Sequence, residues 1–159
     1  MHHYLRFLLM VMTSTALMLV LMYFNTYEFS HVFWSETRFY MALYMGAMMA
    51  VVMLAFMLKN YKNKTANVSI FIASVALFVL SVYLLRSQDT VQDVSWMKAM
   101  IPHHSIAILT SERAQISDPR VRQLADEIIK AQRLEIAEMK ALIADLEGGP
   151  SATPEIDGK

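Results

Sequence analysis

The chain has 159 residues, of which 56% are hydrophobic, and it contains no cysteine. This composition indicates a membrane protein with a modest soluble part, and the lack of cysteine excludes disulfides, zinc–thiolate sites and cysteine nucleophiles. The formal net charge is zero, but residues 1–86 carry six Lys or Arg and two acids, whereas residues 87–159 carry eight and twelve. That asymmetry is typical of a membrane anchor joined to a water-facing domain, and no basic patch suggests nucleic acid.

Three apolar segments are free of charged residues and histidine: Phe7–Phe24, Phe39–Leu58 and Ala66–Leu85. Each has about the 17 to 25 residues that a helix needs to cross the hydrocarbon of a bilayer. The sequence therefore predicts a three-span transmembrane anchor over residues 1–86, with the lipid bilayer as its partner.

The charges between these segments predict an orientation. Three lysines fall in residues 59–64, between the second and third spans, whereas residues 25–38 hold two glutamates and only Arg38. By the positive-inside rule the N-terminus and the lysine loop are cytoplasmic, and the C-terminal domain lies outside. We expect a bacterial cytoplasmic (inner) membrane with a periplasmic or extracellular domain. Five aromatic residues should lie near the outer interface: Tyr23, Tyr27, Phe33, Trp34 and Tyr40.

Residues 87–147 are expected to form a soluble helical hairpin. Apolar residues recur at helical spacing over Thr90–Gln115, with Asp89 or Thr90 as N-cap, and Pro102 should kink or restart that helix near residues 99–102. The second helix should begin at Pro119, capped by Ser117 or Asp118, and end at Leu146, before Gly148 and Gly149. Residues 148–159 are expected to be a disordered tail.

The apolar stripe predicted for the second helix comprises Val121, Leu124, Ala125, Ile128, Met139, Leu142, Ile143 and Leu146. Glu135 falls near the centre of this stripe, beside Gln132. A carboxylate among apolar side chains is costly unless it is paired, protonated or bound to a ligand. Glu135 therefore needs a partner.

Soft metal ligands are concentrated in the hairpin. Met97, Met100 and His104 share one side of the first helix, and an antiparallel hairpin brings Met139 to the same level. Thioether sulfur and imidazole nitrogen suit a soft ion, so this set predicts a Cu(I) site, with silver as a second candidate. His103 and Glu135 are further candidate ligands, or partners that orient an imidazole.

Ordinary packing is the alternative for each of these residues. Methionine at helical spacing is common in apolar cores, and a histidine bonded to Glu135 would serve as a buried polar latch. The same choice applies to a stripe of methionines in the second span, which is either apolar packing or a weak Cu(I) relay: Met41, Met45, Met49, Met53 and Met57.

Two runs of the sequence, Trp96–Ile108 and Asp118–Met139, closely resemble the domain of unknown function 305 (DUF305) family. The family's Met-Ile-x-His-His stretch is matched by residues 100–104, and its Gln-x-x-Glu-Ile-x-x-Met stretch by residues 132–139. The resemblance implies a ferritin-like helical bundle and copper binding at Met97, Met100, His103, His104 and Met139. Leu109 departs from the pattern, since family members often have methionine there.

The expected fold class is therefore all-α: three transmembrane helices followed by a soluble hairpin that completes a ferritin-like four-helix bundle by oligomerisation. A hairpin supplies only two of the four helices that usually enclose a core, so we expect a homodimer or a higher homo-oligomer.

Two functions remain open: a membrane-anchored envelope protein that binds Cu(I) or Ag(I) for copper tolerance or delivery, and a non-metal oligomerisation or interaction module. The first implies envelope copper-handling proteins as partners. No Glu-x-x-His motif, phosphate-binding loop or nucleophile triad is present, so no enzyme activity, catalytic residue or organic cofactor is expected.

Overall fold

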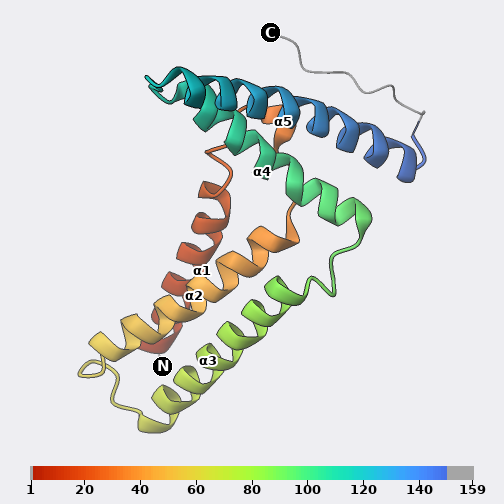
Figure 1. Ribbon diagram of the computed structural model, residues 1–159. Coiled ribbons are helices and arrows are strands. Elements are labelled where there is room, and N and C mark those ends of the chain that lie inside the picture. Colours follow the sequence, from red (N-terminus) through yellow and green to blue (C-terminus); the bar gives the residue numbers. More distant parts are fainter. Residues whose placement is uncertain (1, 150–159) are drawn as a thin grey trace. The chain divides into compact units, whose positions relative to one another are not determined.

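The computed structural model describes residues 2–149, and within them it contains five α-helices, one short 3₁₀ helix and no strand (Figure 1). The expected all-α class is thus confirmed for these residues. The chain divides into two compact units. The first comprises the residues up to Met22 and Glu36–Thr90, and the second comprises Tyr23–Ser35 and the residues from Val91 onward.

The first unit consists of α1 (His2–Leu21), α2 (Glu36–Phe56) and α3 (Lys64–Ser87). All three are long and apolar enough to cross a membrane. Each begins two to five residues before the span predicted from the sequence, because the polar residues at their starts are also helical. Asn63 caps α3, since its side chain accepts a hydrogen bond from the backbone N–H of Ala66 at 3.1 Å.

Small residues bring the helices of the first unit together. α2 packs against both α1 and α3, and its buried positions include Ala42, Gly46 and Ala50 at four-residue spacing. A Cβ atom added at Gly46 would lie 2.2 Å from Thr15 Oγ1, so the absence of a side chain there permits the close approach of α1.

The predicted methionine stripe of α2 is half-buried, and Met53 and Met57 pack against an apolar cluster that contains Phe7 and Leu54.

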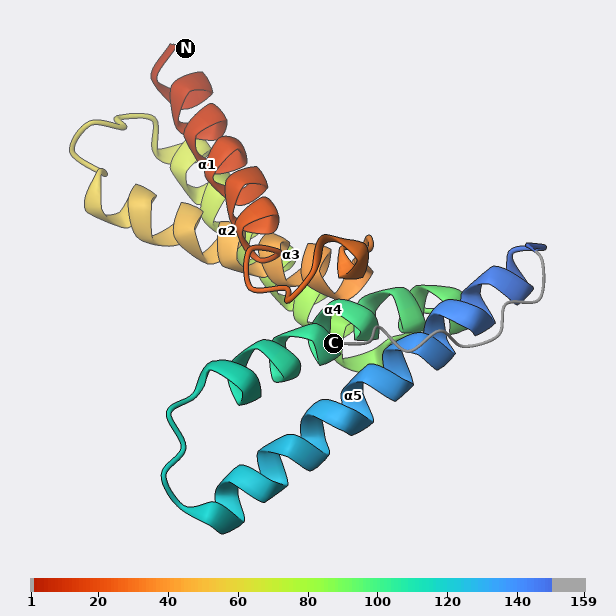
Figure 2. The same ribbon diagram turned by 90° about the horizontal axis from the view of Figure 1, so that it is seen from above.

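The second unit is built on an antiparallel pair of helices, α4 (Asp93–Arg113) and α5 (Pro119–Leu146), which Figure 2 shows joined at one end by a short loop. The bounds of α5 agree with the prediction, and Asp118 is its N-cap, because its side chain accepts the N–H of Arg120 at 2.8 Å. The predicted start of α4 is wrong by three residues, since its N-cap is Gln92. A restart at Pro102 is also wrong, because α4 continues through that buried proline.

The predicted tail at residues 148–159 lies outside the described residues from position 150 onward.

The segment Tyr23–Ser35, which we call the strap, packs on the hairpin. It includes the 3₁₀ helix η1 (Phe29–His31), which contacts α4. Tyr27 and Phe33 of the strap pack against the buried core between α4 and α5. The sequence predicted that Tyr27 and Phe33 lie near the outer membrane interface. In the structure both rings pack against the core of the second unit.

The strap is held by polar contacts to both helices. The backbone N–H of Tyr27 donates to Ser105 Oγ at 2.7 Å, and His31 Nδ1 lies 2.9 Å from the same oxygen. The Tyr27 ring lies 5.7 Å from the Arg133 guanidinium, and a hydrogen bond from its hydroxyl to Glu112 raises the pKa of Tyr27. The second unit therefore has a third layer, built from the chain's own inter-helix loop.

Candidate metal centre

Three methionines from the two hairpin helices belong to one core cluster. Met97 on α4 and Met139 on α5 are buried in the core of the second unit, and the half-buried Met100 packs against the same core. The remaining buried members are apolar: Ile101, Ile108, Ile136 and Ile143. Met97 and Met139 are thus kept from bulk water among isoleucines, whereas Met100 is partly open to it.

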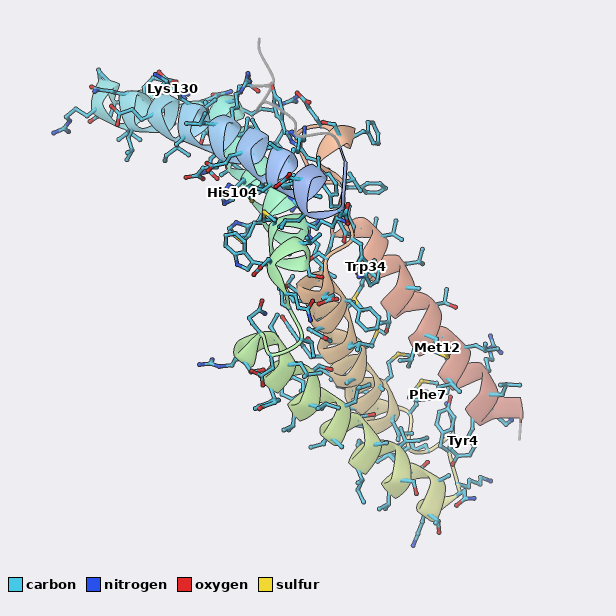
Figure 3. All side chains as sticks on the ribbon, turned by 90° about the vertical axis from the view of Figure 1, so that its right-hand side faces the viewer. Tyr4, Phe7, Met12, Trp34, His104 and Lys130 are labelled. Atoms are coloured by element: carbon cyan, nitrogen blue, oxygen red, sulfur yellow. The ribbon has the colours of Figure 1, made fainter. Side chains whose placement is uncertain are left out.

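His104 lies on α4 beside α5 (Figure 3), and its side chain is 15% exposed. Burial lowers the pKa of His104, an effect that the nearby Glu135 carboxylate partly opposes and His103 reinforces. The neutral imidazole, which is the form that binds a metal ion, is therefore favoured over a wider pH range.

The Nδ1 atom of His104 lies 3.1 Å from Glu135 Oε2, but the two groups are not aligned for a hydrogen bond. In the described residues no other group is aligned to bond to this buried atom. Glu135 also accepts a hydrogen bond from Gln132 Nε2 at 3.2 Å. The carboxylate thus has the partners it was expected to need, although its side chain is 49% exposed rather than enclosed.

His103 does not join this group. Its side chain is exposed, and its ring centroid lies 6.2 Å from that of His104 with the ring planes inclined at 58°. Adjacent residues on a helix diverge by about 100°, which accounts for the separation. Of the six predicted site residues, five therefore lie in the hairpin core or at its edge, and His103 lies outside.

A conventional hard-ligand site is not formed. Among residues 2–149 no group of three or more His, Cys, Asp or Glu side chains is placed to hold a metal ion. The soft donors in or beside the hairpin core are three thioethers and one imidazole, and this set lacks the oxygen ligands that Ca²⁺ and Mg²⁺ require. It fits a soft monovalent ion.

One side of the hairpin is apolar and exposed. Of the predicted α5 stripe, Ala125, Met139 and Ile143 are buried, whereas four members are exposed: Val121, Leu124, Leu142 and Leu146. Trp96, one turn before Met100 on α4, is also exposed. The apolar stripe of α5 is wider than the surface that α4 covers. Glu135 lies at the exposed edge of this stripe.

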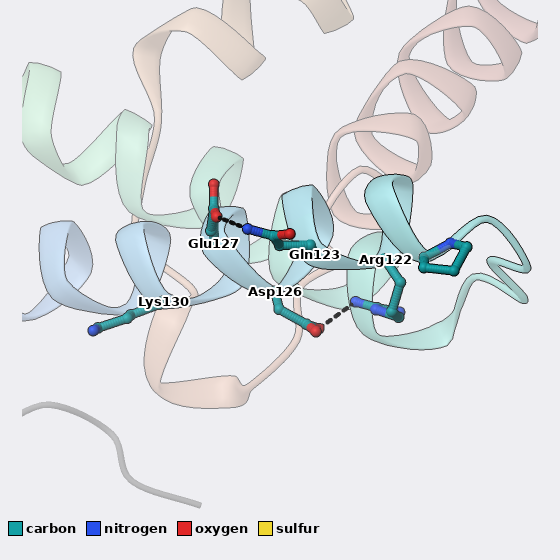
Figure 4. A pocket seen from close by; sticks show the side chains of 6 residues that line it. Arg122, Gln123, Asp126, Glu127 and Lys130 are labelled. Carbon is teal, nitrogen blue, oxygen red and sulfur yellow. Dashed lines mark hydrogen bonds and ion pairs between the residues drawn. The ribbon is translucent and has the colours of Figure 1, made fainter.

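A hollow lies near the start of α5, away from the predicted metal ligands (Figure 4). It has a volume of about 450 Å³ and is lined by residues 119–130 of one helix. Its charged and polar side chains pair within the helix, with Arg122 at 2.8 Å from Asp126 and Gln123 at 3.0 Å from Glu127. None of the predicted metal ligands lines it, and we assign it no role.

Ser105, His31 and Tyr27 were not anticipated. Ser105 is fully buried and directly follows His104, so the hydroxyl that holds the strap adjoins a candidate ligand in sequence. A serine at the buried side of a predicted amphipathic helix was the available signal, because a buried hydroxyl needs a hydrogen-bond partner.

The model of the family described as "Domain of unknown function (DUF305)" matches residues 84–156. A viral protein, "Uncharacterized protein L153" of Acanthamoeba polyphaga mimivirus, is 36% identical over 107 residues, which cover 66% of this chain and 68% of the viral protein. The chain belongs to the DUF305 family. The match confirms the resemblance inferred from the two motifs, and no solved structure matches this DUF305 chain.

The DUF305 match contains both hairpin helices and the end of α3. The 107 residues aligned with the viral protein outnumber all the residues from position 84 to the C-terminus. That similarity therefore continues into the segment before the DUF305 match, which comprises candidate membrane-spanning helices of the first unit.

Proposed function

We propose that this DUF305 protein is a membrane-anchored envelope protein that binds Cu(I), with Ag(I) as the second candidate ion, for copper tolerance or delivery. In this proposal Met97, Met100, Met139 and His104 hold the ion. The observation that carries it is the presence of three methionines from two helices in or against one core cluster, together with an imidazole on α4, one turn after Met100, whose pKa is lowered. When bound there, Cu(I) would supply a soft acceptor that satisfies sulfur and nitrogen donors together.

The residues around this site have different roles. Glu135, close to His104 Nδ1, orients the imidazole and stabilises a positive charge in the site. His103 is exposed, so its place is as a first contact for an incoming ion rather than as a ligand in the core. The isoleucines around Met97 and Met139 keep water from the bound ion.

Anchoring and assembly belong to the same proposal. α1, α2 and α3 cross a bacterial cytoplasmic membrane, with the lysine loop inside and the hairpin outside, where envelope copper-handling proteins can reach it. Two hairpins pair through the exposed stripe that includes Leu142 and Trp96, and this pairing completes a four-helix bundle. Burial of that stripe is favoured because it removes large apolar side chains from water.

A competition titration of the full-length protein with a chromophoric Cu(I) chelator tests metal binding. The strap supplies part of the hairpin's core, so an isolated hairpin would lack Tyr27 and Phe33. The informative variant is Met100→Leu/Met139→Leu/His104→Gln, since leucine conserves methionine's volume and removes only the sulfur donor.

We expect the wild type to withdraw Cu(I) from the chelator and the triple variant to lose that competition. Met12→Leu/Met48→Leu, at exposed positions in α1 and α2, is the matched control and should compete like the wild type. Metal binding at this site is refuted if the wild type fails to compete, or if the triple variant competes equally well.

A non-metal oligomerisation module is the second candidate, and the exposed apolar stripe favours it. In that case His104 and Glu135 only set the register between helices. It predicts that a Cu(I) chelator leaves the oligomeric state and the melting temperature unchanged, while Glu135→Ala alters both. A chelator-induced fall in melting temperature would contradict it.

A further inference from the structure

The strap carries a set of large apolar side chains that are exposed. Phe29 is 97% exposed, Phe24 78% and Trp34 57%, whereas Tyr27 and Phe33 of the same segment pack against the core. Val32 is exposed as well. The strap therefore has an inner set that contacts the hairpin and an outer aromatic set, Phe24, Phe29 and Trp34, whose side chains are more than half exposed.

The position of this outer set in the chain restricts what can cover it. Phe24 follows the end of α1 by three residues, and Trp34, labelled in Figure 3, precedes the start of α2 by two. A residue spans at most about 3.6 Å of extended chain, so the Cα atoms of these two residues lie within roughly 11 Å of a helix end. Both helices are candidate membrane spans.

The chemistry of the outer set fits the same partner. Aromatic rings favour the boundary between headgroups and acyl chains, where tryptophan can keep its indole N–H hydrated. Glu28 is the one Asp, Glu, Lys or Arg residue in the strap, so there is little charge to desolvate and none to attract an anionic lipid specifically. Contact with the bilayer should accordingly be apolar and independent of lipid charge.

We propose that the outer aromatic set of the strap inserts into the interfacial region of the lipid bilayer. This inference rests on the proposed placement of α1, α2 and α3 in a membrane. It assigns the strap two partners: lipid for Phe24, Phe29 and Trp34, and the DUF305 hairpin for Tyr27, His31 and Phe33.

Tryptophan quenching by brominated lipids tests the proposal, because the chain contains only two tryptophans, Trp34 and Trp96. The full-length protein is reconstituted in three kinds of phosphatidylcholine vesicle: without bromine, with bromine on the acyl chains near the headgroup, and with bromine near the chain ends at the centre of the bilayer. Trp96→Phe leaves Trp34 as the sole reporter. Phe29→Trp and, as the span control, Val75→Trp in α3 are made in a background that lacks both native tryptophans.

We expect the Trp34 and Phe29→Trp reporters to lose most of their emission in vesicles brominated near the headgroup. The Val75→Trp control, in the middle of α3, should lose most of its emission in vesicles brominated near the chain ends. Changing part of the lipid to phosphatidylglycerol should leave the quenching unchanged. The Phe29 position is decisive, because Trp34 is close enough to α2 to meet lipid by its position in the chain alone.

Other results separate this inference from the function on which it rests. Quenching at Val75→Trp without quenching at Phe29→Trp would overturn the inference and leave the membrane anchor intact. A Phe29→Trp reporter that is quenched neither by brominated lipid nor by aqueous acrylamide would be covered by protein instead of lipid. This result would also overturn the inference. Absence of quenching at Val75→Trp would refute the membrane anchor, and with it the inference.

Discussion

Removal of the Ser105 hydroxyl should release the strap from the hairpin. Ser105 is fully buried, and its oxygen accepts the Tyr27 N–H at 2.7 Å and lies 2.9 Å from His31 Nδ1. In Ser105→Ala the Tyr27 N–H loses its acceptor. A buried donor without a partner costs about 1–3 kcal/mol, and a cost near 2 kcal/mol raises the open population of the strap about 30-fold.

Hydrogen–deuterium exchange of the full-length protein measures this opening directly. Amides of Tyr27 and its neighbours in the strap should exchange about 30-fold faster in Ser105→Ala, while those in the middle of α5 change little. Thr110→Ala is the matched control, because it also removes a hydroxyl from α4, but an exposed one that bonds to its own helix at 3.0 Å. Equal exchange in both variants would refute the role given to Ser105.

Three further predictions concern different parts of the chain. The metal-free protein should lose stability as the pH falls below 6.5. Burial lowers the pKa of His104 in the folded protein, so the unfolded chain takes up a proton on this residue more readily. In thermal melts, His104→Gln should flatten this pH dependence. Leu142→Glu on the exposed stripe should yield monomers in light scattering, whereas Leu134→Glu, similarly exposed but off the stripe, should not. Gly46→Ala should push α1 away from α2 and lower the melting temperature. Adding Thr15→Ala should restore part of this loss, since Thr15 Oγ1 is the atom that the new Cβ meets. If the effects of the two substitutions on stability simply add in the double variant, that contact is contradicted.

Local signals made much of the helical framework predictable. Asp118 followed by Pro119 is a strong helix start, and it gave the first residue of α5 correctly. Long apolar stretches likewise identified the three helices of the first unit. Pro102 was expected to kink or restart α4, and only the restart is wrong, because a proline costs a helix one hydrogen bond but does not end it when the surrounding packing compensates.

The strap could not be predicted, for a physical reason. Its contacts join Tyr27 and His31 to Ser105 across 78 and 74 residues of sequence, and a loop has no periodicity that points to such partners. The same limit applies to the candidate site. Helical spacing brought Met97, Met100 and His104 to one side of α4, but the exposure of Glu135 depends on how far α5 turns relative to α4.

X-ray absorption at the copper edge of the full-length protein, loaded with one equivalent of Cu(I), tests the central claim most directly. The account predicts a copper centre with both sulfur and nitrogen neighbours, and loss of the sulfur signal in Met97→Leu/Met100→Leu/Met139→Leu. Because the chain has no cysteine, any sulfur neighbour must be a methionine thioether. A centre with only nitrogen and oxygen neighbours, or a protein that retains no copper, would contradict it.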